Sequence, residues 1–379
     1  MLYDENVIIV LLLKITLSPD KYPMNQNNIR QQFKDLHKRI ENSAESLCLP
    51  SKEESISDFF NECWTSFKFI LKEKENILFA LLQLATIAIV YYIWVQMIGW
   101  IPQEVWDAIE KEEEGGLIVS LVFLAWSFLC VGIAAYPIGI FTACMSASYT
   151  LHKEGRVSTI LECLKTVLTK SWALWIFSWL DGWITVNIIL ERLPKKNDRT
   201  PRSVKILKEL VYQLWKTATL SVIPALIYGR TIEEVCNDSL SLLKNYLFPL
   251  GKLRVVYSLF CWIIGIGSYL SLIFLFPHIK AFALEHNIST IFAFYLYIGV
   301  PLLFALFIIV VLLRPLYIIS ATRIYMDYAT ENGLPLRLPT PSSKGLSALI
   351  GFVVLCILIA LVMLYRDELG ITYALQHYL

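Results

Sequence analysis

Seven long apolar runs constrain this chain more than any other feature. They span Ile77–Trp100, Leu117–Thr142, Ser171–Leu190, Leu210–Tyr228, Val255–Phe276, Thr290–Leu313 and Leu346–Leu364. A helix of about 20 apolar residues crosses a hydrocarbon core of roughly 30 Å and satisfies its own backbone hydrogen bonds there. Only 17% of the residues are charged, whereas soluble domains carry about 25%. The sequence therefore predicts an all-α fold, a polytopic transmembrane helical bundle with about five to seven membrane segments.

Charge, cysteines and motifs argue against several classes of function. The net charge is +1, from 33 basic and 32 acidic residues, so no bulk field favours nucleic acid. The 8 cysteines are scattered and form no C-x-x-C pair, which favours small buried side chains over a metal site. No phosphate-binding glycine loop, nucleophile elbow or H-E-x-x-H element occurs. We therefore expect no enzyme activity, no cofactor, no metal and no nucleic-acid partner.

The part of the chain before the first apolar run has two signals. Met24 is an alternative start to Met1, so the residues before it read as an uncertain extension. Apolar side chains from Ile56 to Leu71 then recur at helical spacing, typical of an amphipathic helix lying in the membrane interface. The expected organisation is an extension (1–23), a polar cytoplasmic segment (24–53), an amphipathic interfacial helix (54–76), a helical transmembrane domain (77–365) and a C-terminal tail (366–379).

Loop charges predict the orientation of the bundle. The loop 101–116 has one lysine against six acidic residues, whereas the segments 151–170, 229–254 and 314–345 are rich in lysine and arginine. Cytoplasmic loops carry an excess of lysine and arginine. We therefore expect a cytoplasmic N-terminus, with these three segments on the same side.

One loop does not fit this alternation. Residues 191–209 carry seven basic side chains. Because successive loops lie on opposite sides of the membrane, this loop is nevertheless expected on the outside. Either the third and fourth segments form a hairpin that breaks the rule, or both re-enter and return to the cytoplasmic side. The Asp181-Gly182 pair is a turn signal and, with Pro224, favours a broken or re-entrant path.

Two short stretches resemble each other. Gly155-Arg156 precedes an amphipathic stretch with Thr159-x-x-Glu162 at its start, and Gly229-Arg230 precedes another with Thr231-x-x-Glu234. The Thr-x-x-Glu spacing is that of a capping box. The pattern predicts two amphipathic helices on the cytoplasmic face and a weak internal repeat, a feature common in transporters.

Asp181 is the most informative single residue. A carboxylate inside an apolar stretch is costly unless it is paired or reached by water. Lys216, in the neighbouring apolar run, is its expected partner. Three interpretations stay open: a structural Asp181–Lys216 pair, an aspartate at a re-entrant turn, and a proton or substrate relay.

Other candidate positions are anchors and packing residues. Trp172, Trp175, Trp179 and Trp183 lie on one face of a helix, as expected of a packing stripe or an interface anchor. Arg314 with Pro315 is expected to close the sixth span as an interface anchor whose side chain extends toward the headgroups. Small residues predict close helix packing; they are Gly132, Ala135, Gly139, Ala143 and Ala147 on the second span and Gly265 and Gly267 on the fifth.

A longer pattern covers Ser171–Tyr246 and Arg314–Gly333. It reads Pro224-Ala-Leu-Ile, then Glu233-Glu234, then Ser239-Leu-Ser-Leu-Leu-Lys244, and later Ile324-Tyr325-Met326-Asp327-Tyr328. In this it resembles bacterial multi-pass membrane families of unknown function, related in pattern to the membrane domain of some glycerophosphodiester phosphodiesterases. The resemblance implies a bacterial inner-membrane protein of six to seven helices, and it implies no phosphodiesterase activity because only the membrane domain is similar.

These observations favour a non-enzymatic membrane protein with an accessory role, either in lipid organisation or as the membrane partner of a complex. Membrane lipids are the expected partners, together with another membrane or cytoplasmic protein in the second case. The alternative is a transporter or pore for a small or lipidic substrate, built around Asp181 and Lys216. The two differ in one test, because only the transporter loses a measurable flux on Asp181→Asn.

Overall fold

The computed structural model describes residues 56–98, 114–192, 202–285, 290–339 and 343–365, together with Glu368 and Gly370. The predicted extension (1–23), polar segment (24–53) and most of the tail (366–379) lie outside these residues. The chain divides into two compact units, one formed by residues 1–62 and 201–211 and the other by residues 63–200 and 212–379. The arrangement of helices below is that of the second unit.

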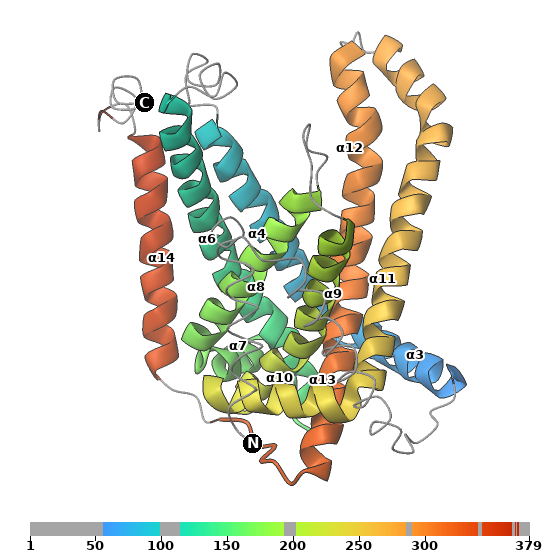
Figure 1. The fold of residues 1–379 in the computed structure, drawn as a ribbon, viewed down its shortest axis with the longest axis vertical. Coiled ribbons are helices and arrows are strands. Elements are labelled where there is room, and N and C mark those ends of the chain that lie inside the picture. The colour runs from blue at the N-terminus through green and yellow to red at the C-terminus, as the bar shows by residue number, and fades with distance from the viewer. Residues whose placement is uncertain are drawn as a thin grey trace, which may run out of the picture. The chain divides into compact units, whose positions relative to one another are not determined.

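Every regular element in the described part of the chain is helical, which confirms the all-α prediction (Figure 1). Four segments are long and apolar enough to cross a membrane: Lys74–Gln96, Phe123–Lys153, Pro249–Phe282 and Tyr297–Glu331. The protein is therefore an integral membrane protein. The helices are α3 (Ile56–Lys72), α4 (Lys74–Ile98), α6 (Glu114–Lys153), α7 (Ile160–Leu168), α8 (Ser171–Arg192), α9 (Arg202–Ala218), a 3₁₀ turn η1 (Thr219–Ser221), α10 (Val222–Ile227), α11 (Ile232–Glu285), α12 (Thr290–Ile308), a π-helical turn η2 (Ile309–Leu313), α13 (Arg314–Glu331) and α14 (Ser343–Leu364).

Helix α6 is the centre of the packed part of the bundle, with α4 and α8 as its main neighbours. A Cβ at Gly132 would lie 2.7 Å from the Trp179 ring, and one at Gly139 would lie 2.4 Å from Ser178 Oγ. Glycine at these positions therefore lets α8 approach α6 closely, as small residues do in membrane helices. The prediction for α6 is confirmed. The prediction for Gly265 and Gly267 is not met, because a Cβ at either would meet nothing within 4 Å.

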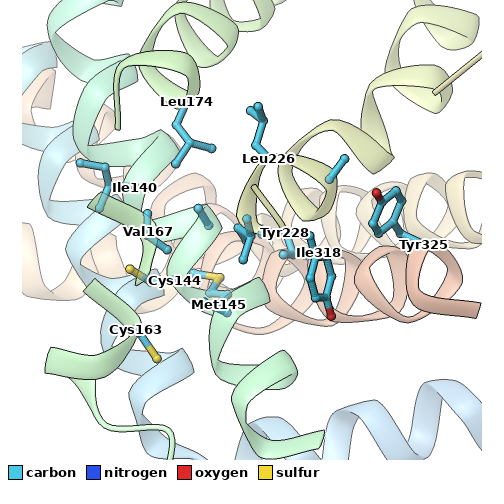
Figure 2. Close-up of a cluster of buried hydrophobic side chains, with 14 of the residues drawn as sticks. Ile140, Cys144, Met145, Cys163, Val167, Leu174, Leu226, Tyr228, Ile318 and Tyr325 are labelled. Atoms are coloured by element: carbon cyan, nitrogen blue, oxygen red, sulfur yellow. The ribbon is translucent and has the colours of Figure 1, made fainter. Parts of the chain in front are cut away.

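The core collects side chains from α4, α6, α7, α8, α10, α11, η2 and α13, and Figure 2 shows part of it. Cys144 and Cys163 are fully buried members of it, and neither is bonded in a disulfide. The remaining labelled members are Ile140, Met145, Val167, Leu174, Leu226, Tyr228, Ile318 and Tyr325. These two cysteines pack as small apolar side chains, as the sequence predicts.

The expected turn at Asp181-Gly182 is wrong. Helix α8 runs without interruption from Ser171 to Arg192. Gly182 serves packing instead, since a Cβ there would lie 3.2 Å from Val131 of α6, and the Asp181 carboxylate binds other side chains rather than a turn backbone.

The break lies in the fourth predicted segment. There α9 ends at Ala218, the 3₁₀ turn η1 follows, and α10 carries Pro224. Because α9, η1 and α10 are separate elements, Leu210–Tyr228 is not one continuous spanning helix.

Three helices end in the same way at one end of the bundle. Gly155, Gly229 and Gly333 have φ values of 72°, 83° and 64°, in the left-handed region that favours glycine at a helix C-terminus. In each case the following residue donates a backbone hydrogen bond five positions back: Arg156 to Leu151 (2.9 Å), Arg230 to Ala225 (3.4 Å) and Leu334 to Ala329 (2.8 Å). We call this end of the bundle the turn end.

Hydrogen bonds connect the separate segments that meet at the turn end. Lys170 Nζ donates to the carbonyl of Gly229 at 2.8 Å, and the Tyr246 hydroxyl donates to the Glu331 carboxylate. Parts of the segments 151–170, 229–254 and 314–345 thus share one end, in agreement with the loop charges. That this end faces the cytoplasm stays a prediction.

Both expected helix starts are also present. The Thr159 and Thr231 hydroxyls each accept the backbone N–H of the glutamate three residues later, at 3.3 Å. Helix α7 begins after the first cap and α11 after the second. The local structure of the two stretches is therefore alike, while the internal repeat as a whole stays a prediction.

Candidate intramembrane polar site

Asp181 and Lys216 form an ion pair between α8 and the last turn of α9. Lys216 Nζ lies 2.7 Å from Asp181 Oδ1 and 2.6 Å from Oδ2. Trp215 Nε1 donates a further hydrogen bond of 3.2 Å to Oδ1. Both oxygens of the carboxylate are therefore occupied by donors, which is the arrangement that a charged pair in a membrane requires. The structure brings the two predicted residues together, and a relay function stays a prediction.

Arg314 differs from its expected place. It does not close a span, because helical structure continues from Thr290 through η2 and α13 to Glu331. Arg314 lies midway along the candidate span Tyr297–Glu331 and is partly buried. Pro315 has no N–H to continue the α-helical ladder, and the Arg314 N–H bonds to the Ile309 carbonyl in π-helical geometry. Such π-bulges occur frequently at functional sites.

The Arg314 guanidinium has few partners. It donates one side-chain hydrogen bond, from Nη2 to Thr142 Oγ1 at 3.4 Å. No carboxylate of the described residues lies within ion-pair distance of it. Asp181 is close enough to interact electrostatically, but Lys216 already occupies that carboxylate. Arg314 is therefore a partly buried cation that the described residues only partly compensate.

A buried amide lies next to Thr142. Gln83 Nε2 donates to Thr142 Oγ1 at 2.8 Å and to the Ile138 carbonyl at 3.2 Å. Hydrogen bonds of this kind hold membrane helices together, here α4 and α6. The sequence analysis missed Gln83, although a lone amide inside an apolar run is itself a signal.

A second cation faces this region from α11. Arg254 Nε donates to Gln213 Oε1 at 3.1 Å, and its guanidinium lies 6.0 Å from the centre of the Tyr257 ring. That ring stacks on Tyr317 of α13 with centroids 4.4 Å apart. The loop-charge argument counted Arg254 as a loop residue, whereas the structure places it inside the candidate span Pro249–Phe282.

We call these side chains the intramembrane polar cluster; its members are Gln83, Thr142, Asp181, Lys216, Arg254, Tyr257, Arg314 and Tyr317. The cluster has three cations and one carboxylate. Among the described residues no group of three or more His, Cys, Asp or Glu side chains could hold a metal ion. Excess positive charge with several N–H donors is suited to binding an anion.

The tryptophan stripe packs mainly on α6. Trp175 Nε1 donates to the Gly132 carbonyl at 2.8 Å, and Trp179 Nε1 donates to the Phe128 carbonyl at 3.1 Å. Trp183 meets the Phe128 ring edge to face at 4.8 Å. Only Trp172, 62% exposed, has the environment expected of an interface anchor. For the other three, helix packing is the observed role.

At the turn end, charge and burial shift several pKa values. Hydrogen bonding to Asp238, at 2.8 and 3.0 Å, raises the pKa of Arg230. Burial raises the pKa of the Cys163 thiol in α7 to about 12. A thiol with such a pKa is protonated near neutral pH and is a poor nucleophile, so Cys163 does not supply a reactive group.

Comparisons with known proteins add no assignment: no family model, no curated protein and no solved structure matches this chain. The fold and the site define a class, a polytopic α-helical membrane protein with a cationic polar cluster among its helices. The resemblance to the membrane domain of glycerophosphodiester phosphodiesterases stays a prediction.

Proposed function

We propose that the protein is a non-enzymatic membrane protein that organises lipid at the turn end. The observation that carries this proposal is the composition of the exposed surface of α3 and α7. Trp64 and Leu71 of α3 are 56% and 52% exposed, and Lys68 Nζ lies 5.6 Å from the centre of the Trp64 ring. An exposed aromatic beside a lysine is typical of a helix at the headgroup level.

Helix α7 repeats this pattern. Leu161 is 60% exposed, and Val157, just before the helix, is 76% exposed. Lys165 lies on the same short helix, where it pairs with Glu162 at 3.1 Å. Apolar side chains exposed beside basic ones bind anionic lipid through buried apolar area and charge together. We infer an accessory role for this surface in holding lipid around the protein.

Native mass spectrometry of the mildly extracted protein tests this proposal. We expect retained anionic phospholipid, and less of it when Leu161→Glu places a carboxylate on the lipid-facing surface of α7. Glu162→Gln, on the same helix, is the matched control and should retain as much lipid as the parent protein. Equal retention by the parent and Leu161→Glu would contradict the proposal. If a protein partner is retained in stoichiometric amount instead, and Leu161→Glu loses it, the protein is the membrane partner of a complex rather than an organiser of lipid.

The intramembrane polar cluster favours a second candidate, a transporter that uses Asp181 and Lys216. Proteoliposomes loaded with a pH-sensitive dye test its simplest form, proton flux. Asp181→Asn should abolish the flux, while Thr185→Val, which removes only a hydrogen bond to the Asp181 carbonyl, should keep it. Absence of flux in the parent protein, or unchanged flux in Asp181→Asn, contradicts proton transport through this pair.

A further inference from the structure

The charges of the intramembrane polar cluster do not balance. Lys216 occupies both oxygens of Asp181, which leaves Arg314 and Arg254 without a carboxylate among the described residues. A guanidinium has five N–H donors. Arg314 uses one toward Thr142 and Arg254 uses one toward Gln213. Most of the donors of both side chains therefore have no acceptor in the described part of the protein.

A third group at the same place lacks an acceptor. The Tyr317 hydroxyl is buried and makes no hydrogen bond of normal geometry among the described residues, although the Arg254 guanidinium lies close to it. Tyr317 follows Arg314 by three positions on α13, so the two side chains lie on the same face of the helix. A buried hydroxyl is normally hydrogen-bonded, and this one requires an acceptor.

Tyr257 connects the three groups. Its ring stacks on Tyr317 at 4.4 Å, lies 6.0 Å from the Arg254 guanidinium and is within electrostatic range of Arg314. Two cations and one unsatisfied hydroxyl thus converge around one aromatic ring, between α11 and α13.

The depth of this place is suitable for a headgroup. Arg254 follows Tyr246, whose hydroxyl binds at the turn end, by eight residues, or about 12 Å along a helix. Val255, the next residue, is 66% exposed, so an exposed apolar surface adjoins Arg254. A headgroup of the leaflet at the turn end would need to enter by about two helical turns.

We propose that Arg254, Arg314 and the Tyr317 hydroxyl bind one phosphate group, carried either by an anionic phospholipid or by a small soluble molecule. Arginine recognises phosphate through paired N–H donors, and the hydroxyl supplies a further donor. The bound oxyanion neutralises the excess positive charge and satisfies the buried hydroxyl. The site lies between membrane helices, apart from the exposed surface of α3 and α7, and the inference does not depend on the function proposed for that surface.

Titrations of the full-length protein in a neutral detergent test this site. The probes are dioleoyl phosphatidylglycerol in mixed micelles and inorganic phosphate, with dioleoyl phosphatidylcholine as the reference lipid. Binding is followed by intrinsic tryptophan fluorescence. We expect Arg314→Gln to raise the apparent Kd by about tenfold or more, and Tyr317→Phe by about threefold to tenfold. Arg156→Gln is the matched control, because Arg156 is exposed and pairs with Glu154 at the turn end, and its Kd should equal that of the parent.

The outcomes separate the sources of the phosphate. Binding of phosphatidylglycerol alone assigns the site to a lipid headgroup, and binding of inorganic phosphate as well assigns it to a soluble phosphate. The proposal is overturned if neither probe binds the parent protein, or if Arg314→Gln binds as the parent does. Should Arg314→Gln fail to fold, an unchanged Kd in Tyr317→Phe overturns the proposal equally.

Discussion

Helices α6 and α11 have similar apolar sequences but opposite surroundings. In the candidate span of α6, 61% of the most apolar window is buried, whereas in that of α11 none is. Glycines show the same contrast. Gly132 and Gly139 of α6 have no room for a Cβ, while Gly265 and Gly267 of α11 have open space around theirs. An apolar run with small residues therefore specifies a membrane helix without specifying what the helix packs against.

The difference has a physical origin. In lipid, burying an apolar side chain against another helix brings little hydrophobic gain, because lipid tails are equally apolar. Close packing and hydrogen bonds then supply the specificity. Helix α6 has both, through its glycines and through Trp175 and Gln83. Between α11 and α12, drawn side by side in Figure 1, the side-chain contacts of the described residues include the hydrogen bond from Ser268 to the Pro301 carbonyl and the ring contact of Phe276 with Tyr297. We expect stability to be concentrated around α6, and the four predictions below test this from the largest effect to the smallest.

Asp181→Asn should have the largest effect. It leaves the Lys216 ammonium without its carboxylate at a partly buried position, and breaking such a pair costs about 3 kcal/mol of unfolding free energy. Thermal unfolding in detergent measures the loss. The double variant Asp181→Leu with Lys216→Met removes both charges and should recover most of the stability. If the double variant is as unstable as Asp181→Asn alone, the loss does not come from an uncompensated charge.

Gly139→Leu and Gly265→Leu should differ sharply. At Gly139 a larger side chain collides with Ser178 Oγ and with the Leu174 carbonyl, 3.1 Å from the Cβ position, and overpacking of this kind costs about 2 kcal/mol. At Gly265 the leucine enters open space, and we expect a change within about 0.5 kcal/mol. Unfolding of the two purified variants side by side gives the comparison. Equal destabilisation would mean that α11 is as closely packed as α6.

The sequence predicts the helical elements of the described region well and their neighbours poorly. Apolar length places α4, α6, the apolar part of α11 and α12, and the Thr-x-x-Glu signals place the starts of α7 and α11, because these depend on local chain chemistry. It does not place α13, which the sequence analysis counted as loop. The sequence-based prediction is wrong at Asp181-Gly182, where two long-range contacts favour a helix over the expected turn. Lys216 binds the Asp181 carboxylate, and Val131 packs against Gly182.

The candidate site divides in the same way. Asp181 and Lys216 can be paired from the sequence, since each is a charge inside an apolar run. Arg314 and Arg254 cannot be placed, because a cation at the boundary of an apolar run looks the same as one inside a longer helix. Only the continuation of helix through η2 and across Pro249 puts them within the candidate spans.

One serine in α6 and one in the α11–α12 hairpin each make a hydrogen bond to another helix, and removing each bond compares the two regions. Ser146 of α6 is fully buried and shares a 2.7 Å hydrogen bond with Thr322, whereas Ser268 of α11 donates at 2.7 Å to the Pro301 carbonyl of α12. Ser146→Ala leaves Thr322 without that partner and should cost about 1 kcal/mol. Ser268→Ala should cost about 0.5 kcal/mol. Unfolding measurements that rank the two in the opposite order would place the stabilising contacts in the hairpin.

The smallest expected effect concerns the start of α11, where Glu234 caps the helix ahead of the kink at Tyr246. The Thr231 backbone N–H donates to the Glu234 carboxylate at 2.8 Å, and this hydrogen bond lowers the pKa of Glu234 from its ordinary value of 4.5. The folded state therefore favours the ionised form. Its contribution is present above pH 4.5 and is lost as the pH falls through the lowered pKa of the folded state.

Hydrogen exchange at the first turn of α11 measures this contribution. Parent and Glu234→Gln are compared at each pH, so that the intrinsic pH dependence of exchange cancels. The parent should be the more protected above pH 4.5, and the two should converge at lower pH. Glu162→Gln is the control, since the Glu162 carboxylate pairs with Lys165 in α7 and should leave α11 unaffected. Profiles that stay parallel to acid pH would show that Glu234 does not hold the start of α11.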